Sequence, residues 1–237
     1  TVVAAPNLPL VGARLAPRIT DRFDLKCSMD NDASLAILGE LFCGAGRGLT
    51  NFFGLTVGTG IGGGIILNKK LYHGEQGGAA EFGHIVVDAG GFQCTCGHQG
   101  CLETRASGTA IDRAAKKMVE AKPTSALARR AQDAPEGITG PMVFEAAREG
   151  DQDALAILAD IGRWLGIGIG SLINVLDPEL VVIGGGAASA IELVHDVVRE
   201  EMAKTVINPR SKQIPTAIST LANRAGLLGA AALVFEF

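Results

Sequence analysis

The order of apolar and polar positions divides the chain into short apolar runs that alternate with segments of helical period. Leu35, Leu38 and Phe42 recur at spacings of three and four, which is typical of the buried face of a helix. Short apolar runs bounded by glycine, proline or asparagine are typical of strands. These rules predict the end of a strand at 1–5, strands at 25–29, 51–57, 64–67 and 180–183, and helices at 33–43, 107–121, 142–149, 151–176, 191–204 and 225–237. Strands that alternate with helices indicate an α/β fold.

Three segments have no regular period and predict irregular structure. Residues 6–17 are rich in proline and read as a connection. Residues 74–101 are dominated by glycine, cysteine and histidine. Residues 122–140 mix Pro123 and Pro135 with small polar residues, so we expect a flexible connection there.

Composition and charge exclude several classes of protein. Of the 237 residues 47% are hydrophobic and 19% charged, which is close to the globular average and excludes a disordered chain. The net charge of −4 argues against a nucleic-acid-binding protein, which would be expected to carry an excess of positive charge. The apolar stretches at 165–176 and 225–235 are too short and too rich in glycine and alanine for a membrane span. Five cysteines, three of them within eight residues, favour a cytosolic protein with a metal site over a disulfide framework.

The cysteine cluster is the sharpest local signal. Cys94, Cys96 and Cys101 follow His84, which lies ten residues upstream of the first cysteine. Three thiolates and one imidazole supply the four tetrahedral ligands of a closed zinc site, which leaves no position for a reactive water. The spacing therefore predicts structural zinc, with His98 as a rival fourth ligand that spacing alone does not exclude.

Two glycine-rich turns are candidate phosphate sites. Gly58–Gly63 matches G-x-G-x-x-G, but an apolar strand follows it where a dinucleotide fingerprint needs a helix. What remains is a strand–turn–strand whose amides can line a phosphate, with Thr59 adding a hydroxyl; an ordinary glycine-rich hairpin fits as well. Gly184–Gly186 ends a strand before a helix, where open α/β sheets present ligands, and a plain tight turn fits equally.

Three carboxylates lie near these features. Asp32 begins a predicted helix, whose N-terminus favours the ionised form that a general base requires. An N-cap role is the simpler explanation of Asp32. Glu81 and Glu103 flank the cysteine cluster and are suited to accept hydrogen bonds from sugar hydroxyls, although solvated loop acids would look the same.

Taken together, these motifs resemble the ROK family of bacterial sugar kinases and repressors, and within it most closely the glucokinases. The matching segments are 5–8, 31–33, 39–40, 58–64, 81–84, 94–103, 106–108 and 176–186. Ser34 stands where the family commonly has Asn, and Asp30 where it commonly has Glu.

The resemblance implies an actin-like ATPase (ribonuclease H-like) fold, in which two α/β lobes close over a cleft. Residues 1–20 would be the end of the N-terminal lobe and a connection, 21–222 the larger C-terminal lobe with its zinc loop at 84–101, and 223–237 a helix returning to the small lobe. The family's first phosphate loop, Asp-x-Gly-Gly-Thr, appears nowhere in the chain. We therefore expect roughly one hundred further residues ahead of Thr1, about one small domain, and activity only in the longer parent protein.

The resemblance also implies roles for individual residues. The activity would be ATP-dependent phosphorylation of a hexose, glucose first, at the 6-hydroxyl, with Asp32 as the base. The implied sugar ligands are Asn31, Asp32, Glu81, His84 and Glu103, the implied ATP ligands Thr59, Gly60, Gly184, Gly185 and Gly186, and the implied zinc ligands His84, Cys94, Cys96 and Cys101. Mg²⁺ would bridge the ATP phosphates.

The resemblance leaves two functions open. The first is the kinase, for which the resemblance implies a homodimer or higher homo-oligomer in the cytoplasm. Neither a nucleic acid nor a membrane is expected as its partner. The alternative is the sugar-sensing domain of a ROK-type transcriptional repressor without kinase activity. The glycines of 58–64 and the presence of Asp32 favour the kinase.

Overall fold

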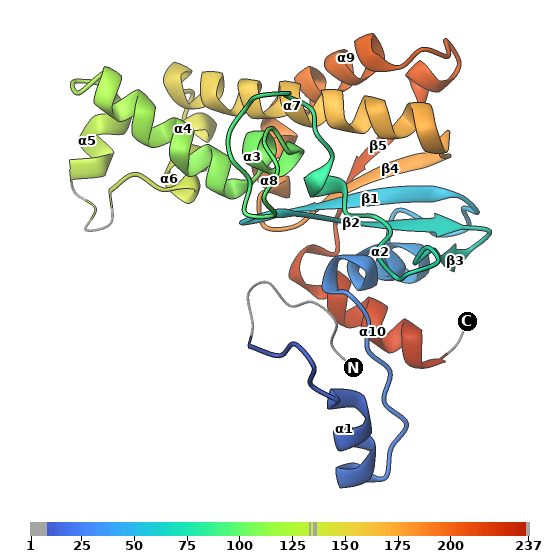
Figure 1. Cartoon of the computed structure of the whole chain (residues 1–237). Helices are drawn as coiled ribbons and strands as arrows, with labels where there is room; N and C mark the ends of the chain where they lie inside the picture. Colours follow the sequence, from blue (N-terminus) through green and yellow to red (C-terminus); the bar gives the residue numbers. More distant parts are fainter. Residues whose placement is uncertain (1–8, 133, 135–136, 236–237) are drawn as a thin grey trace.

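A five-stranded mixed sheet forms the middle layer of the computed structural model, with helices on both faces (Figure 1). The strand order is β3–β2–β1–β4–β5. Along the chain, β1 (Phe52–Val57), β2 (Ile61–Leu67) and β3 (Lys70–Leu71) form an antiparallel meander. The last two strands, β4 (Leu180–Gly184) and β5 (Thr216–Ile218), run parallel to β1. The predicted α/β class is confirmed.

The structure describes residues 9–132, 134 and 137–235. Within this part of the chain the sheet carries one large and one small apolar core, on its opposite faces. The predicted strand end at 1–5 lies outside the described residues, as do the last two residues of the predicted helix at 225–237.

The larger core is organised around α7 (Gln152–Leu176), which packs most extensively against α9 (His195–Thr205). By length and composition α7 would be able to cross a membrane, but 61% of its most apolar stretch is buried inside this core. The same side of the sheet carries α3 (Leu102–Ala106), α4 (Gly108–Ala121), α5 (Ala126–Gln132), α6 (Gly140–Arg148) and α8 (Ala188–Ile191). Short 3-10 turns are η1 (Phe82–His84), η2 (Glu192–Val194), η3 (Ser211–Gln213) and η4 (Ala222–Arg224).

The smaller core lies under the other face, where α2 (Asp32–Cys43) crosses α10 (Ala225–Phe235) (Figure 1). The crossing is tight: a Cβ added at Gly229 would lie 1.7 Å from the carbonyl oxygen of Leu35. The glycines of β2 serve the same close packing, because a Cβ at Gly64 would lie 2.8 Å from Cβ of Ile37 on α2. These contacts hold the N-terminal end of α2 near the β1–β2 turn.

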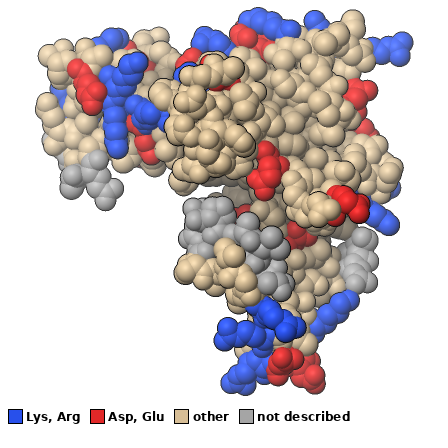
Figure 2. Space-filling view, in the orientation of Figure 1, with Lys and Arg blue, Asp and Glu red and all other residues tan. Residues whose placement is uncertain are grey.

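The first helix, α1 (Leu15–Phe23), lies away from the sheet (Figure 1). None of its residues is buried within the described part of the chain. Its surface carries both basic and acidic side chains, at the lower end of the space-filling view (Figure 2).

Four sequence expectations about local structure were wrong. The segment 25–29 is irregular, and it pairs with no strand in the described chain. The connection predicted for 6–17 ends in the start of α1, and the connection predicted for 122–140 contains α5. The strand predicted at 64–67 begins earlier, at Ile61, so that the turn between β1 and β2 is only Gly58–Gly60. The strand β5 was not predicted.

Candidate functional site

The N-terminal end of α2 presents two candidate residues side by side. Asn31 is the N-cap: its Oδ1 accepts hydrogen bonds from the backbone N–H groups of Ala33, at 3.0 Å, and Ser34, at 3.1 Å. Asp32 is the first helical residue, and its carboxylate also receives the N–H of Ala33, at 2.9 Å. Because Asn31 fills the capping role, the Oδ2 atom of the exposed Asp32 carboxylate is left to act on a ligand at the positive end of the helix.

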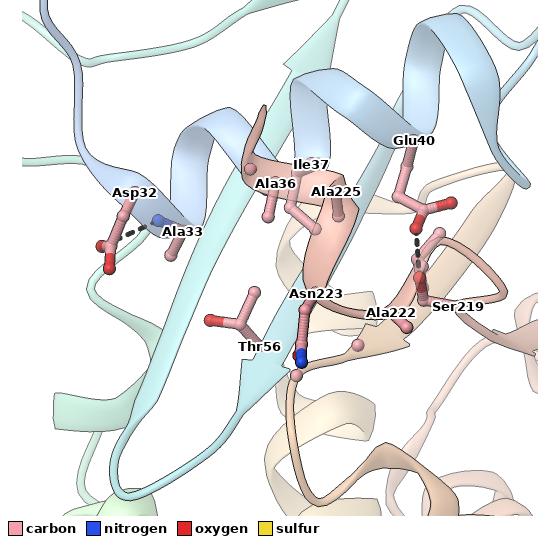
Figure 3. Close-up of a pocket in the computed structure, with 14 residues that line it drawn as sticks. Asp32, Ala33, Ala36, Ile37, Glu40, Thr56, Ser219, Ala222, Asn223 and Ala225 are labelled. Carbon is pink, nitrogen blue, oxygen red and sulfur yellow. Dashed lines mark hydrogen bonds between the residues drawn. The ribbon is translucent and has the colours of Figure 1, made fainter. Parts of the chain in front are cut away.

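Asp32 opens onto a cavity of about 240 Å³ between α2, the ends of β1 and β4, and the start of α10, which we call the central cavity. Figure 3 shows Asp32 at the start of α2 and Glu40 further along it, with Thr56 and Asn223 between them. Gly184 and Gly185 also line this cavity. Gly185 adopts φ +90°, and a Cβ there would lie 2.4 Å from the carbonyl oxygen of Val57, so the turn requires glycine.

A second, smaller pocket of about 70 Å³ adjoins the same helix end; we call it the Glu81 pocket. It brings together Asn31 and Glu81, two of the predicted sugar ligands, although fifty residues separate them in sequence. Glu81 directly precedes η1, and Gly62 and Gly63 of β2 form another wall. The carboxylate of Glu81 can accept and the amide nitrogen of Asn31 can donate hydrogen bonds, and together with a bare glycine strand they suit a polyhydroxylated ligand.

The third pocket, of about 240 Å³, contains the predicted nucleotide residues Thr59 and Gly186; we call it the Phe144 pocket. The turn Gly58–Gly60 is tied to α4, because Gly108 N–H donates to Gly58 O at 2.7 Å and the Thr109 hydroxyl donates to Thr59 O at 2.8 Å. The remaining wall comes from α4 and α6 and includes Asp112 and Phe144. Sequence reasoning missed these two residues, since neither belongs to a local motif.

The two other carboxylate and imidazole candidates, Glu103 and His84, are not among the described residues that line the Glu81 pocket. Oε2 of Glu103 accepts the backbone N–H of Ile61 at 2.8 Å, and a Cβ added at Gly60 would lie 2.2 Å from the same oxygen. In this structure the Glu103 carboxylate therefore supports the glycine turn from the side of α3, and Gly60 lies against it.

The cysteine cluster is assembled as the spacing predicts. One ligand atom from each of His84, Cys94, Cys96 and Cys101 lies within 4.8 Å of the others, so the group could hold a metal ion. His84 Nδ1 lies 3.6 Å from Sγ of Cys94, and Sγ of Cys96 lies 3.6 Å from Sγ of Cys101. His98, the rival ligand, contacts Cys96 through Nδ1 at 3.5 Å but is not part of this four-residue group.

The thiols of the cluster differ in environment. Cys101 is fully buried, and burial raises its pKa to about 12. Cys96 is exposed, and a hydrogen bond from the backbone of His98 lowers its pKa to about 6. A buried thiolate at Cys101 needs a compensating positive charge, and a bound cation supplies one. Three sulfurs and one imidazole form a donor set that Zn²⁺ prefers.

Comparison with known proteins identifies the family of the chain. The model of the ROK family matches residues 1–236. A glucokinase of Streptomyces coelicolor is 38% identical over 239 residues, which cover 100% of this chain and 75% of that protein. A xylose repressor of Caldicellulosiruptor bescii is 33% identical, over 100% of this chain and 59% of that protein.

A solved structure extends the comparison to the fold. The crystal structure of a ROK family glucokinase from Streptomyces griseus, in complex with glucose and AMPPNP, has a TM-score of 0.90 and 38% identity. The match covers 100% of this chain and 77% of that chain. The mixed sheet and its helices thus have the actin-like ATPase fold of ROK sugar kinases. On sequence and fold alike, this chain belongs to the ROK family.

Proposed function

We propose that the chain is the sugar- and nucleotide-binding part of an ATP-dependent hexose kinase that phosphorylates glucose at its 6-hydroxyl. The observation that carries the proposal is the position of Asp32. Its carboxylate lines the central cavity together with Gly184 and Gly185, while the preceding residue, Asn31, lines the Glu81 pocket. One helix end thus serves both compartments, as transfer of a phosphoryl group between two bound substrates requires.

In the proposed mechanism, Asn31 and Glu81 hold the sugar by hydrogen bonds to its hydroxyl groups. Asp32 accepts the proton of the 6-hydroxyl as that oxygen attacks the γ-phosphate of ATP, and ADP leaves. A positioned base contributes about 10²–10⁴ in rate, and orientation of the two substrates contributes much of the rest. His84 and Glu103 are proposed as sugar ligands from the resemblance alone, since neither is among the described residues that line the Glu81 pocket.

The nucleotide is proposed to bind along the opposite side of the glycine turn. Thr59 and Gly60 would contact phosphate oxygens, with Mg²⁺ bridging the phosphates of ATP as it does in other phosphoryl transfers. The adenosine would run along Gly184–Gly186 into the Phe144 pocket, whose lining includes Gly186. The aromatic ring of Phe144, which lines this pocket, is proposed to contact the adenine ring of ATP.

The cysteine cluster is proposed to bind one structural zinc ion. His84, Cys94, Cys96 and Cys101 would be the ligands, and the full complement of four protein ligands leaves no position for catalysis. His84 follows Glu81 by one turn of η1, so the ion would fix the loop that carries a proposed sugar ligand.

The layout of the whole protein is proposed from the resemblance. Residues 1–20 would end the small lobe, 21–222 would form the large lobe, and 223–237 would return to the small lobe. The exposed helix α1 runs across the proposed boundary at residue 20. A homo-oligomer in the cytoplasm is proposed on the same ground, and size-exclusion chromatography with light scattering tests the oligomer.

The second candidate function is a sugar-sensing domain of a transcriptional repressor, which the similarity to a xylose repressor favours. The intact turn Gly58–Gly60 and the carboxylate of Asp32 favour the kinase. A coupled ADP-release assay on the full-length protein, with ATP, Mg²⁺ and a panel of hexoses, separates the two. Turnover that is fastest with glucose is expected. Sugar binding by calorimetry without turnover on any sugar would instead support the repressor.

A further inference from the structure

One hydrogen bond joins the two sides of the Glu81 pocket. His73 Nε2 lies 2.6 Å from Oδ2 of Asp30, and both residues line the pocket. Asp30 directly precedes Asn31 and Asp32, whereas His73 follows β3 on the loop that leads to Glu81. The contact therefore links the two segments that carry the proposed sugar ligands and the proposed base.

Both oxygens of the Asp30 carboxylate make hydrogen bonds within the protein. Its side chain is only 12% exposed, and its other oxygen, Oδ1, accepts the backbone N–H of Asn31 at 2.8 Å. An ionised carboxylate only accepts hydrogen bonds, so the Nε2 of His73 carries the proton that is shared with Asp30. Asp30 thus connects the imidazole to the backbone of Asn31.

The loop that His73 begins is a closed unit. The backbone N–H of Ala79 donates to His73 O at 3.0 Å, so residues 73–79 form a loop with joined ends. Ala80 follows with φ +69°, a left-handed conformation that is costly for a residue with a Cβ. Such a conformation persists only where contacts on both sides hold it, and here it directly precedes Glu81.

We propose that the His73–Asp30 pair is a latch that holds the loop 73–80 against the start of α2, and that this latch positions Glu81 for the sugar. This inference rests on the proposed sugar site. His73 is then a positioning residue: it sets the affinity for the hexose, and it leaves the affinity for ATP unchanged because the Phe144 pocket shares no described lining residue with the Glu81 pocket.

The test compares His73→Ala, His73→Gln, Asp30→Ala, the double variant Asp30→Ala/His73→Ala and the control Gln76→Ala in the full-length protein. Gln76 is exposed on the same loop and is not among the described residues that line the pocket, so its variant is the matched control. Calorimetry gives the Kd for glucose, and steady-state kinetics give KM for glucose and for ATP. Loss of a hydrogen bond to a charged, partly exposed partner is expected to weaken glucose binding about 3- to 30-fold in His73→Ala.

Three further results are expected of a latch. His73→Gln, whose amide nitrogen can reach the place of Nε2, restores glucose affinity to within about threefold of wild type. KM for ATP stays within about twofold of wild type in every variant, because the latch acts on the sugar alone. Asp30→Ala combined with His73→Ala weakens binding no more than the worse single variant, because both changes remove the same contact.

Two results would overturn the latch. One is a glucose affinity in His73→Ala that matches Gln76→Ala. The other is an equal rise in both KM values that His73→Gln does not reverse, which would indicate a general structural defect. Wild-type protein is measured first: if it binds no hexose, the proposed function fails and the latch fails with it. If wild type is active and His73→Ala is unaffected, only the latch fails.

Discussion

The crossing of α2 and α10 is expected to tolerate no added methyl group at Gly229. A Cβ at this position would lie 1.7 Å from the carbonyl oxygen of Leu35 and 3.0 Å from the backbone nitrogen of Gly39. Both neighbours are backbone atoms of one helix, so neither can rotate away. Restoring an ordinary contact of 3.4 Å to the Leu35 oxygen would separate the two helices by about 1.7 Å.

The cost of Gly229→Ala follows from two opposing effects. Overpacking of this kind typically costs about 1–3 kcal/mol, and replacing glycine by alanine within a helix recovers up to about 1 kcal/mol. Because the added Cβ would meet fixed backbone atoms, the upper half of the overpacking range applies, and we expect a net loss of about 1–2 kcal/mol in the free energy of unfolding. This loss would lower the urea midpoint by about 0.3–2 M. The rate of the folded protein is also expected to fall, because α2 carries Asp32 and a shift of about 1 Å in a catalytic group can cost 10²-fold in rate.

Gly226→Ala is the matched control on the same helix. Among the described atoms its Cβ would meet only the carbonyl oxygen of Asp32, at 3.9 Å, which is ordinary contact. This variant is expected to unfold at the same urea concentration as wild type or a higher one. A Gly229→Ala protein as stable as wild type would refute the argument that glycine is needed at the crossing.

Four other changes test separate parts of the site. Asp32→Asn is expected to lower kcat by about 10²–10⁴-fold and to leave glucose affinity within a few-fold, as steady-state kinetics and calorimetry will measure. Phe144→Ala is expected to raise KM for ATP and not KM for glucose, because Phe144 lines only the proposed adenosine pocket. Metal analysis of freshly purified protein is expected to give one zinc per chain; less than half an equivalent would contradict the site, and removal by a chelator should lower the melting temperature. Hydrogen bonds from the backbone of Asn51 and Thr50 lower the pKa of Glu179 below 4.5, so its stabilising contribution is present above about pH 4.5 and is lost as the pH falls through the lowered value. Acid unfolding followed by circular dichroism should therefore be less steep in Glu179→Gln than in wild type.

The sequence predicts best those helices and strands whose apolar residues repeat at the spacing that burial of one or both faces requires. The helix α2 packs its apolar face into the smaller core, and the strand β4 is buried on both faces of the sheet, where its residues contribute to both cores. The cysteine spacing was equally informative, since ligands to one ion must converge wherever the loop runs. The structure also shows which residue caps α2. The sequence was compatible with Asp32 as the N-cap, but the side chain of Asn31 accepts the capping hydrogen bonds from Ala33 and Ser34.

The elements that were missed depend on distant partners. The three-residue strand β5 exists because it pairs with β4, and its own residues are only partly buried. The segment 25–29 has the composition of a strand, but a strand is stable only when a neighbour satisfies its backbone, and the described chain gives it none. In the same way Asp112 and Phe144 reach one pocket from two helices, and no spacing along the chain records that.

The position of Glu103 explains how a structural metal would affect a reaction that takes place elsewhere. Cys101 is the N-cap of α3, and Glu103 in the first turn of that helix accepts the N–H of Ile61 at the end of the glycine turn. The Thr104 hydroxyl, which donates to Cys101 O at 2.7 Å, stiffens the same helix turn. A metal ion that fixes Cys101 would therefore fix, through one five-residue helix, the turn that is proposed to contact phosphate. The cluster also includes His84, the last residue of η1, and Glu81 directly precedes η1. Because a single cluster is joined to both sides of the β1–β2 turn, loss of the metal should weaken sugar and nucleotide binding together, whereas loss of the His73–Asp30 contact should weaken sugar binding alone.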